Sequence, residues 1–157
     1  MGVLHHLPRP ADGFRALAKL LVPGGMLVAW CYAREGNGWV LALVDPARRV
    51  TSRLPLRVVS GLAAAVTLPL WTALRALYAP ALTRPGLRRL LPYERYLSDL
   101  VPFPFREVHS IAFDQLLAPV AHYMPRGEIE RCFAESGLRL ASLRWHHANS
   151  WAAHGYL

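Results

Sequence analysis

One stretch near the start of the chain, residues 2–32, constrains the fold more than any other part of the sequence. Its first residues are apolar and end at His5 and His6. The apolar residues of segment 14–21 then recur at i, i+3, i+4 and i+7, which predicts an amphipathic helix. A PGG turn follows and leads into segment 26–32, whose apolar run predicts a strand.

The strand expected at residues 26–32 shows no polar alternation, which is typical of a strand buried on both faces. Such strands belong to parallel sheets that are covered by helices, so the sequence predicts an α/β fold. In an open α/β sheet, ligands bind beyond the carboxyl ends of the strands. His5 and His6 end the apolar segment 2–7 and Tyr32 ends the later strand, so these side chains are candidates for a site.

The middle of the chain is apolar and interrupted by arginine and proline, and it predicts helices that lie outside the sheet. Asp45 and Pro46 form the expected start of one helix, as an N-cap followed by proline at the first helical position. Prolines divide residues 51–92 into several short expected helices. Two further helices are expected at residues 93–100 and 109–117.

The last part of the sequence predicts one helix and two strands. Residues 126–136 place three apolar side chains on one helical face, and a glycine follows directly. Residues 138–145 alternate between apolar and polar, which predicts a strand with one wetter face. The strand expected at residues 151–157 follows too closely for a parallel crossover, so the two strands are expected to form an antiparallel hairpin.

Composition indicates which binding partners and which cellular compartment to expect. The net charge is +8, but the arginines are scattered rather than clustered, so we expect no nucleic-acid partner. Cys31 and Cys132 lie in apolar surroundings, which is typical of buried thiols in a reducing compartment, and a cytoplasmic location is expected. No spacing of cysteine or histidine predicts a metal site, and no signal peptide is expected.

Segment 58–74 is apolar and contains no charged residue, so it is the part of the chain that raises the question of membrane contact. Arg57 and Arg75 flank it, and it is shorter than the roughly 20 residues that a membrane-spanning helix needs. Pro69 lies inside it and predicts a break. We therefore expect a pair of buried or interfacial helices rather than a membrane span. The alternative function that follows is a peripheral membrane or partner-binding module built on residues 58–80.

Residues 2–32 resemble the second half of class I S-adenosylmethionine-dependent methyltransferases. In that family a strand ends in an LHH-type motif, here residues 4–6, and an amphipathic helix follows. A PGG turn, here residues 23–25, then leads into a buried strand. The ending at residues 126–157 resembles the family's helix, strand and antiparallel last strand. The REGNG and FDQLLAPVAHY segments resemble the acceptor-pocket region of a bacterial subgroup.

The resemblance implies a partial Rossmann-like methyltransferase sheet. That sheet would comprise the end of strand four and strands five, six and seven, with an antiparallel last strand. A helical acceptor-side insertion at residues 39–123 is implied within one truncated domain, residues 1–157. Strand four would pair with residues 26–32, so a partner chain or the insertion is expected to cover that apolar edge.

The family's cofactor-binding motifs do not occur in this sequence. It contains no glycine-rich loop between a strand and a helix, and no acidic residue after a second strand of the family's sheet. The chain therefore resembles the C-terminal half of an enzyme. S-adenosylmethionine is the cofactor that the resemblance implies, and we expect it to bind this isolated chain very weakly or not at all. The chain is expected to be inactive alone.

The candidate site combines the resemblance with the residues themselves. His5 and His6 are the catalytic candidates, because imidazole transfers protons near neutral pH. The resemblance places Val3, Leu4 and His5 near the methionine end of the cofactor. The substrate-binding candidates are polar or aromatic residues that follow a strand or interrupt an apolar region: Tyr32, Arg34, Asn37, His109, Asp114, His122 and Tyr123. The methyl acceptor is expected to be a small apolar molecule, because apolar pockets favour apolar ligands.

Overall fold

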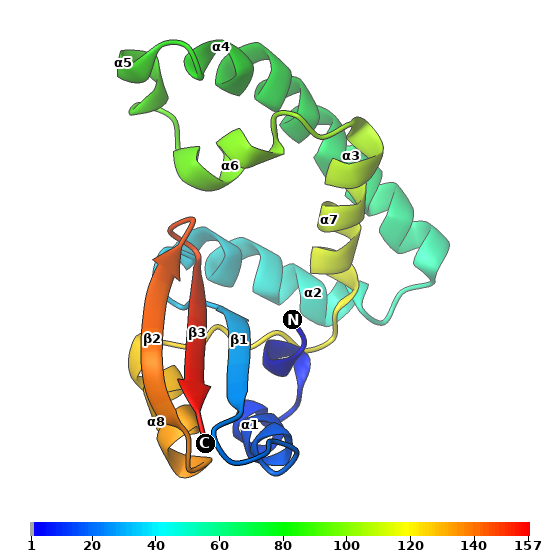
Figure 1. Ribbon diagram of the computed structural model, residues 1–157. Helices are drawn as coiled ribbons and strands as arrows, with labels where there is room; N and C mark the ends of the chain where they lie inside the picture. The colour runs from blue at the N-terminus through cyan, green and yellow to red at the C-terminus, as the bar shows by residue number, and fades with distance from the viewer. Residues whose placement is uncertain (1) are drawn as a thin grey trace. The chain divides into compact units, whose positions relative to one another are not determined.

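The computed structural model describes residues 2–157, except for the side chains of Pro85 and Arg88. The chain divides into two compact units (Figure 1). The first unit combines residues up to Gly38 with Val120–Leu157, and the second is Trp39–Pro119. The insertion expected at residues 39–123 thus begins at the same residue as the second unit and extends slightly beyond its end.

The first unit is a three-stranded antiparallel sheet with helices on one face (Figure 1). Its elements are η1 (Leu4–His6), α1 (Pro10–Ala18), β1 (Met26–Tyr32), α8 (Arg126–Glu135), β2 (Arg139–His146) and β3 (Ser150–Tyr156). The strand order is β1-β3-β2, so the strand that comes last in the chain lies in the middle of the sheet.

The antiparallel hairpin at the end of the chain is confirmed. β2 pairs with β3 from Arg139 opposite Tyr156 to His146 opposite Ser150. His147 has a positive φ in the turn between the two strands, as does its neighbour in the chain. The helix before the hairpin is also confirmed, and the three apolar side chains expected on one of its faces are buried.

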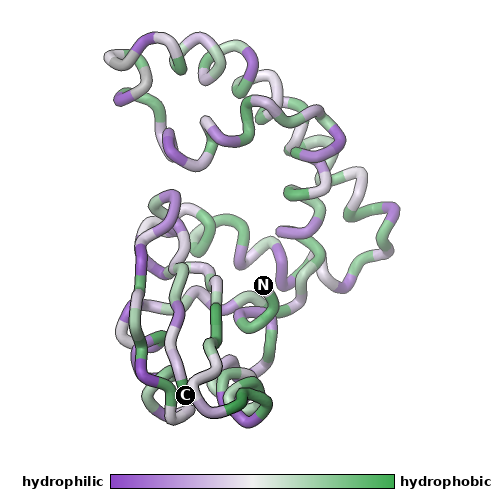
Figure 2. Tube along the Cα trace, in the orientation of Figure 1, coloured by the Kyte–Doolittle hydropathy of each residue, from purple (hydrophilic) through white to green (hydrophobic). Residues whose placement is uncertain are grey.

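β1 is not buried on both faces, contrary to what its apolar run predicts. Leu27 and Cys31 are buried, whereas Met26 and Val28 are 49% and 46% exposed. The expected parallel sheet is wrong as well, because β1 pairs only with β3 among the described strands, and that pairing is antiparallel. Only one face of β1 is buried because α1 and α8 both pack against the same face of the sheet. The sequence pattern alone did not distinguish this one-sided arrangement, since β1 is apolar along most of its length (Figure 2).

The core of the first unit lies between the sheet and these two helices. Phe14 of α1 and Phe133 of α8 are fully buried, and their rings meet edge to face at 5.3 Å. Gly155 in β3 allows this close approach, because a Cβ there would lie 2.9 Å from the Phe133 ring and 2.7 Å from the Arg139 carbonyl oxygen. The small residue in the central strand therefore determines how near α8 comes to the sheet.

The N-terminal segment forms a turn where the sequence suggests a strand end. Within η1, the His6 N–H donates to the Val3 carbonyl at 2.9 Å, and the Leu7 N–H donates to the Leu4 carbonyl at 3.2 Å. These local bonds use the backbone groups that strand pairing would need, and Pro8 then redirects the chain. The expected end of a fourth strand is therefore wrong for this segment in the structure.

The second unit is helical. Its elements are η2 (Val40–Val44), α2 (Asp45–Thr51), α3 (Leu56–Ala73), η3 (Leu74–Tyr78), α4 (Ala79–Ala81), α5 (Pro85–Arg88), α6 (Glu94–Leu100) and α7 (Phe105–Leu117). The helices expected at residues 93–100 and 109–117 are confirmed as α6 and α7, although α7 starts earlier. The helix α2 begins at Asp45 as expected, but the expected N-cap role of Asp45 is wrong, because the helical residues of η2 run into α2 without a break.

The pair of short helices expected around Pro69 is also wrong. α3, η3 and α4 form one continuous helix, Leu56–Ala81, of 26 residues. Pro69 lacks an N–H and so cannot donate the backbone bond to Ala65, but the helix continues through it. By length and composition alone, this helix is long and apolar enough to cross a membrane.

Candidate functional site

Three segments that are distant in the sequence meet at the carboxyl end of β1. The His122 N–H donates to the His5 carbonyl at 2.7 Å, which ties residues 120–124 to η1. The Met124 N–H donates to the Tyr32 carbonyl at 2.9 Å, and the Arg34 N–H donates to the Met124 carbonyl at 3.3 Å. The segment that resumes the first unit therefore holds η1 beside the end of β1.

The side chains carried by these segments form a cluster of rings, which we call the aromatic cluster: His5, His6, Trp30, Tyr32 and Tyr123. The Tyr32 ring lies at its centre, with centroid distances of 4.1 Å to His5, 6.0 Å to His6, 5.3 Å to Trp30 and 5.3 Å to Tyr123. Tyr32 and Tyr123 stack at an interplanar angle of 15°. The structure thus brings together four of the sequence-predicted residues, His5, His6, Tyr32 and Tyr123.

The two histidines of the cluster differ in burial and in bonding. His5 is 1% exposed, and its ring lies 4.3 Å from that of His6. The Nδ1 atom of His6 lies 2.7 Å from the Val120 carbonyl oxygen. A carbonyl oxygen only accepts hydrogen bonds, so Nδ1 of His6 carries the proton and Nε2 has the lone pair in the neutral ring. His6 therefore presents a basic nitrogen at a fixed orientation.

Trp30 is the member of the cluster that the sequence patterns did not single out. It lies in β1 two residues before Tyr32, and its ring makes an edge contact with His5 at 5.6 Å. The apolar residues around it in the sequence predict a place in the core. The signal that was available is the two-residue spacing, because residues i and i+2 of a strand share a face.

The loop after β1 is anchored to the turn between β2 and β3. The side-chain amide of Asn37 is buried and donates to the carbonyl oxygens of Ala33 at 2.7 Å and Asn149 at 2.6 Å. Gly36 adopts a φ of +77°, and a Cβ there would lie 2.0 Å from the Ala148 carbonyl oxygen. Asn37, a predicted substrate-binding residue, therefore has both amide protons committed to positioning the loop.

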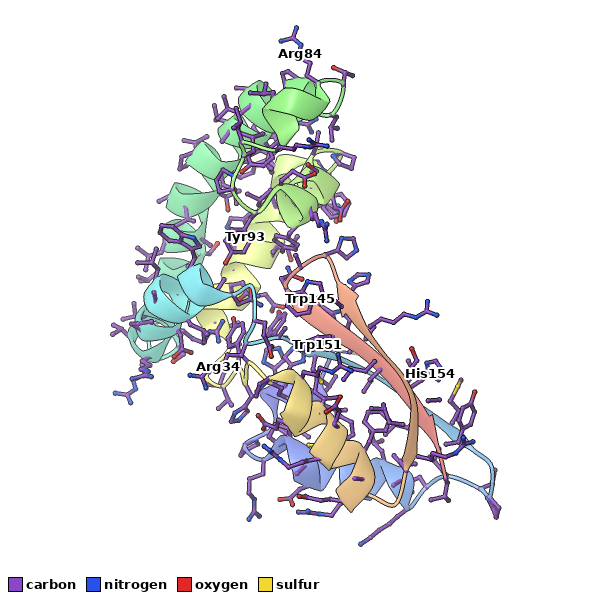
Figure 3. All side chains as sticks on the ribbon, turned by 90° about the vertical axis from the view of Figure 1, so that its left-hand side faces the viewer. Arg34, Arg84, Tyr93, Trp145, Trp151 and His154 are labelled. Atoms are coloured by element: carbon purple, nitrogen blue, oxygen red, sulfur yellow. The ribbon has the colours of Figure 1, made fainter. Side chains whose placement is uncertain are left out.

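Glu35 fastens the same loop to α8 and β3. Its carboxylate accepts hydrogen bonds from the Arg126 backbone N–H at 3.1 Å and from the Trp151 indole N–H at 3.3 Å. Partial burial by itself raises the pKa of Glu35, but these bonds and its own backbone N–H outweigh burial, and the pKa lies below its usual value. Arg34 is exposed on this loop (Figure 3).

The remaining predicted site residues of the first unit lie near the cluster without joining its rings. His122 contributes its backbone N–H, and its buried Nε2 atom has no hydrogen-bond partner among the described residues. Val3 is exposed, and Leu4 packs against the core formed by α1, α8 and the sheet. A buried ring nitrogen without a partner is a group that a bound molecule could satisfy.

His109 and Asp114 belong to α7 in the second unit. His109 lies between α7 and α3, where its Nε2 is 3.1 Å from the Ser60 carbonyl oxygen and its ring stacks on Phe105 and Phe113. These contacts account for His109 as a link between the two helices. Asp114 is exposed on α7.

The two cysteines are buried and chemically quiet. Desolvation, together with a smaller contribution from nearby acidic groups, raises the pKa of Cys31 to about 12 and the pKa of Cys132 to about 11. Both thiols therefore stay protonated at neutral pH and are poor nucleophiles. Their predicted burial is confirmed. Across the described residues, no three side chains of His, Cys, Asp or Glu gather as metal ligands.

A cavity of about 340 Å³ lies at the other end of the first unit, near the start of β1. Residues at the carboxyl ends of α1 and α8 line it, together with Leu157. It is open to solvent and contains none of the predicted site residues, and Arg15 and Glu135 form an ion pair at 3.5 Å on its rim. The aromatic cluster is therefore the stronger candidate.

The comparisons with known proteins add no information about the candidate site, so its description rests on its geometry. No family model, no curated protein and no solved structure matches this chain.

Proposed function

We propose that this chain takes part in methyl transfer from S-adenosylmethionine to a small apolar acceptor and supplies the acceptor side of the site. The observation that carries the proposal is the aromatic cluster. Its members come from three segments of the chain, and each segment contains residues that resemble the methyltransferase pattern. The antiparallel last strand, which the resemblance also implies, is an additional support.

The residues of the cluster suit the methyl-bearing end of the cofactor. The faces of Trp30, Tyr32 and Tyr123 attract a cation through their ring electrons, and the sulfonium of S-adenosylmethionine is a cation. When bound, the cofactor supplies the reactive methyl group. The 157 residues contain no glycine-rich loop for the adenosine end. We assign that end to polypeptide outside these residues.

The roles of the cluster residues follow from their geometry. The rings around Tyr32 exclude water and align the acceptor, which is the main protein contribution to a transfer of this kind. The Nε2 atom of His6 accepts a proton from an acceptor that must lose one, since its Nδ1 proton is held by the Val120 carbonyl.

The test begins with the coding DNA upstream of the Met1 codon. We expect an in-frame strand–glycine–helix segment there, and we expect the longer product to transfer a labelled methyl group to quinone or lipid acceptors. His6→Gln should slow that transfer, whereas His154→Gln, which lies opposite Val28 near the start of β1, should not. By calorimetry, the 157-residue chain alone should bind S-adenosylmethionine with a dissociation constant above about 1 mM, a free energy weaker than about −4 kcal/mol.

Two results would overturn the proposal. One is an upstream frame without such a segment, together with no methyl transfer by any product of the gene. The other is tight, micromolar binding of S-adenosylmethionine by the 157-residue chain alone, because the adenosine end would then bind to residues to which we assign no such role.

A further inference from the structure

The long helix of the second unit, Leu56–Ala81, buries only one of its sides. Val59, Ala63, Thr67, Leu74 and Tyr78 are buried along it and follow helical spacing. The core of the unit joins the last part of this row to α6 and α7. The buried row accounts for the packing of the helix, so the rest of its surface is left for other contacts.

The rest of the helix surface is apolar where a helix of a soluble protein is normally polar. The large apolar side chains exposed along the helix are between 41% and 62% exposed: Leu56, Val58, Leu62, Val66, Leu68 and Leu77. The hydroxyl of Thr72, one turn after Leu68, donates a hydrogen bond to the Leu68 carbonyl at 2.8 Å, so this polar group is satisfied within the helix. Val58, Leu62 and Val66 are four positions apart and form one exposed apolar stripe, and such a surface marks a place of interaction.

The charges around this apolar side identify the partner. No Asp or Glu occurs in Leu56–Ala81, whereas Arg57 and Arg75 lie on the helix and Arg53 and Arg84 lie just beyond its ends. All four arginines are exposed. Arginine can bury its carbon stem in apolar surroundings while its guanidinium reaches a phosphate. A helix whose exposed surface is apolar and whose only charged residues are arginines is complementary to a membrane surface with anionic lipids.

We propose that the exposed side of Leu56–Ala81 binds an anionic lipid bilayer and lies in the boundary between headgroups and acyl chains. This inference goes beyond the proposed methyl transfer, since it rests on the second unit alone. It makes the chain a peripheral membrane protein whose attachment combines burial of apolar side chains with attraction between arginine and phosphate.

The packing of the second unit favours an interfacial position over a membrane span. The long helix is held along its length by α7, where His109 contacts the Ser60 carbonyl and Val108 shares a core with Leu74. α7 has only 13 residues, and it exposes Glu107 and Asp114. A span would carry these carboxylates into hydrocarbon, at high energetic cost. Contact through one side of the long helix leaves them in water.

Vesicle flotation tests the inference with the full 157-residue chain. We expect binding to vesicles of phosphatidylcholine with about 30% phosphatidylglycerol, weaker binding to phosphatidylcholine alone, and release of the bound chain by alkaline carbonate. Leu62→Gln/Val66→Gln should weaken binding at least about tenfold, because it removes two apolar side chains from the interface. These positions are exposed, so circular dichroism should show an unchanged fold.

A matched pair of charge variants separates local attraction from net charge. Arg53→Gln/Arg57→Gln should weaken binding to the anionic vesicles by about fivefold for each arginine. Arg139→Gln/Arg144→Gln removes the same charge from exposed positions in the first unit and should leave binding within about twofold.

Three results would overturn the inference: no binding to anionic vesicles, equal binding by Leu62→Gln/Val66→Gln, or resistance of the bound chain to carbonate. Self-association that this double variant abolishes, without any vesicle binding, would assign the apolar side to a second copy of the chain instead. Methyl transfer is measured separately, so failure of either proposal leaves the other intact.

Discussion

Gly36 and Gly137 both have a positive φ but differ in what surrounds them. At Gly36 a Cβ would lie 2.0 Å from the Ala148 carbonyl oxygen, whereas at Gly137 nothing lies within 4 Å. The conformation alone penalises alanine at both positions by roughly 1–2 kcal/mol. The loop that holds Asn37 therefore depends on Gly36 for close backbone approach as well as for its turn.

This difference predicts unequal effects of the same substitution. Gly137→Ala should lower the free energy of unfolding by about 1 kcal/mol, and Gly36→Ala by at least about 3 kcal/mol, because the backbone of the turn before β3 must move. Urea denaturation of the two variants measures both values. Equal losses would show that the loop yields freely and that the contact with Ala148 does not constrain it.

The buried thiol of Cys31 predicts a loss of stability in alkali. Desolvation raises its pKa in the folded chain from 9.0 to about 12, so the unfolded chain releases this proton first as pH rises. Stability from this group is complete below pH 9 and is lost as pH rises toward the folded pKa. The slope is about 1.4 kcal/mol per pH unit between pH 9 and pH 11.

Urea denaturation at pH 8, 9.5 and 10.5 measures that slope. Other groups also titrate there, so the comparison is with Cys31→Ala, whose overall stability differs but whose slope should be shallower by about 1.4 kcal/mol per pH unit. The same slope in both proteins would mean that Cys31 is accessible to water in the folded state.

At the scale of the element, β1 has two unlike edges. The Ala33 N–H donates toward β3, to the Asn149 carbonyl, while the Tyr32 carbonyl accepts from Met124 on the other side. Backbone groups alternate between the two sides along a strand. The N–H groups of Met26, Val28 and Trp30 therefore face the free edge, where no backbone partner occurs among the described residues.

Amide hydrogen exchange tests this assignment. The amides of Leu27, Ala29 and Cys31 bond to β3 and should exchange slowly, whereas those of Val28 and Trp30 should exchange at least about 100-fold faster, because they need no opening of the sheet. Strong protection of both sets would reveal a strand or a second chain along this edge, as the sequence led us to expect.

The sequence was informative where local chemistry decides the structure and uninformative where distant packing does. The helix at residues 126–136 and the final hairpin follow from spacing and loop length. The continuation of the helix through Pro69 depends on its packing against α7. The one-sided burial of β1 depends on where α1 and α8 pack. Neither effect has a local signal.

The site shows the same division. The sequence singled out His5, His6, Tyr32 and Tyr123 as candidates because each is a polar or aromatic group that ends or interrupts an apolar segment. Trp30 was missed because a tryptophan within an apolar strand has the same pattern whether it fills the core or lines a site. The structural use of Asn37 was hidden as well, because its two partners are backbone carbonyls, one of them far along the chain.

At the scale of the whole molecule, the second unit is a continuous insertion into the first. The core around Phe14 and Phe133 draws only on residues of the first unit, as do the bonds that hold the aromatic cluster. Stability of the first unit should therefore be separable from that of residues 39–119.

Replacing residues 39–119 with about 12 glycine and serine residues, which span up to roughly 40 Å, should leave the first unit folded. We expect cooperative thermal unfolding and a near-ultraviolet circular dichroism signal from the stacked tyrosines. Phe133→Asp in the shortened chain is the control and should abolish both. A shortened chain that fails to unfold cooperatively would show that the insertion supports the core.

The pairing of β1 with β3 also governs the order of events during synthesis. Tyr32 pairs with Ser150, so β1 leaves the ribosome more than a hundred residues before its partner strand exists. At about 5–20 residues per second, that interval is on the order of 6–24 s. During this interval the ribosome synthesises the whole insertion, and the uncharged strand β1 has no native neighbouring strand. The nascent chain thus depends on chaperones, or on early docking of α1 over β1, to reach the central strand that closes the sheet.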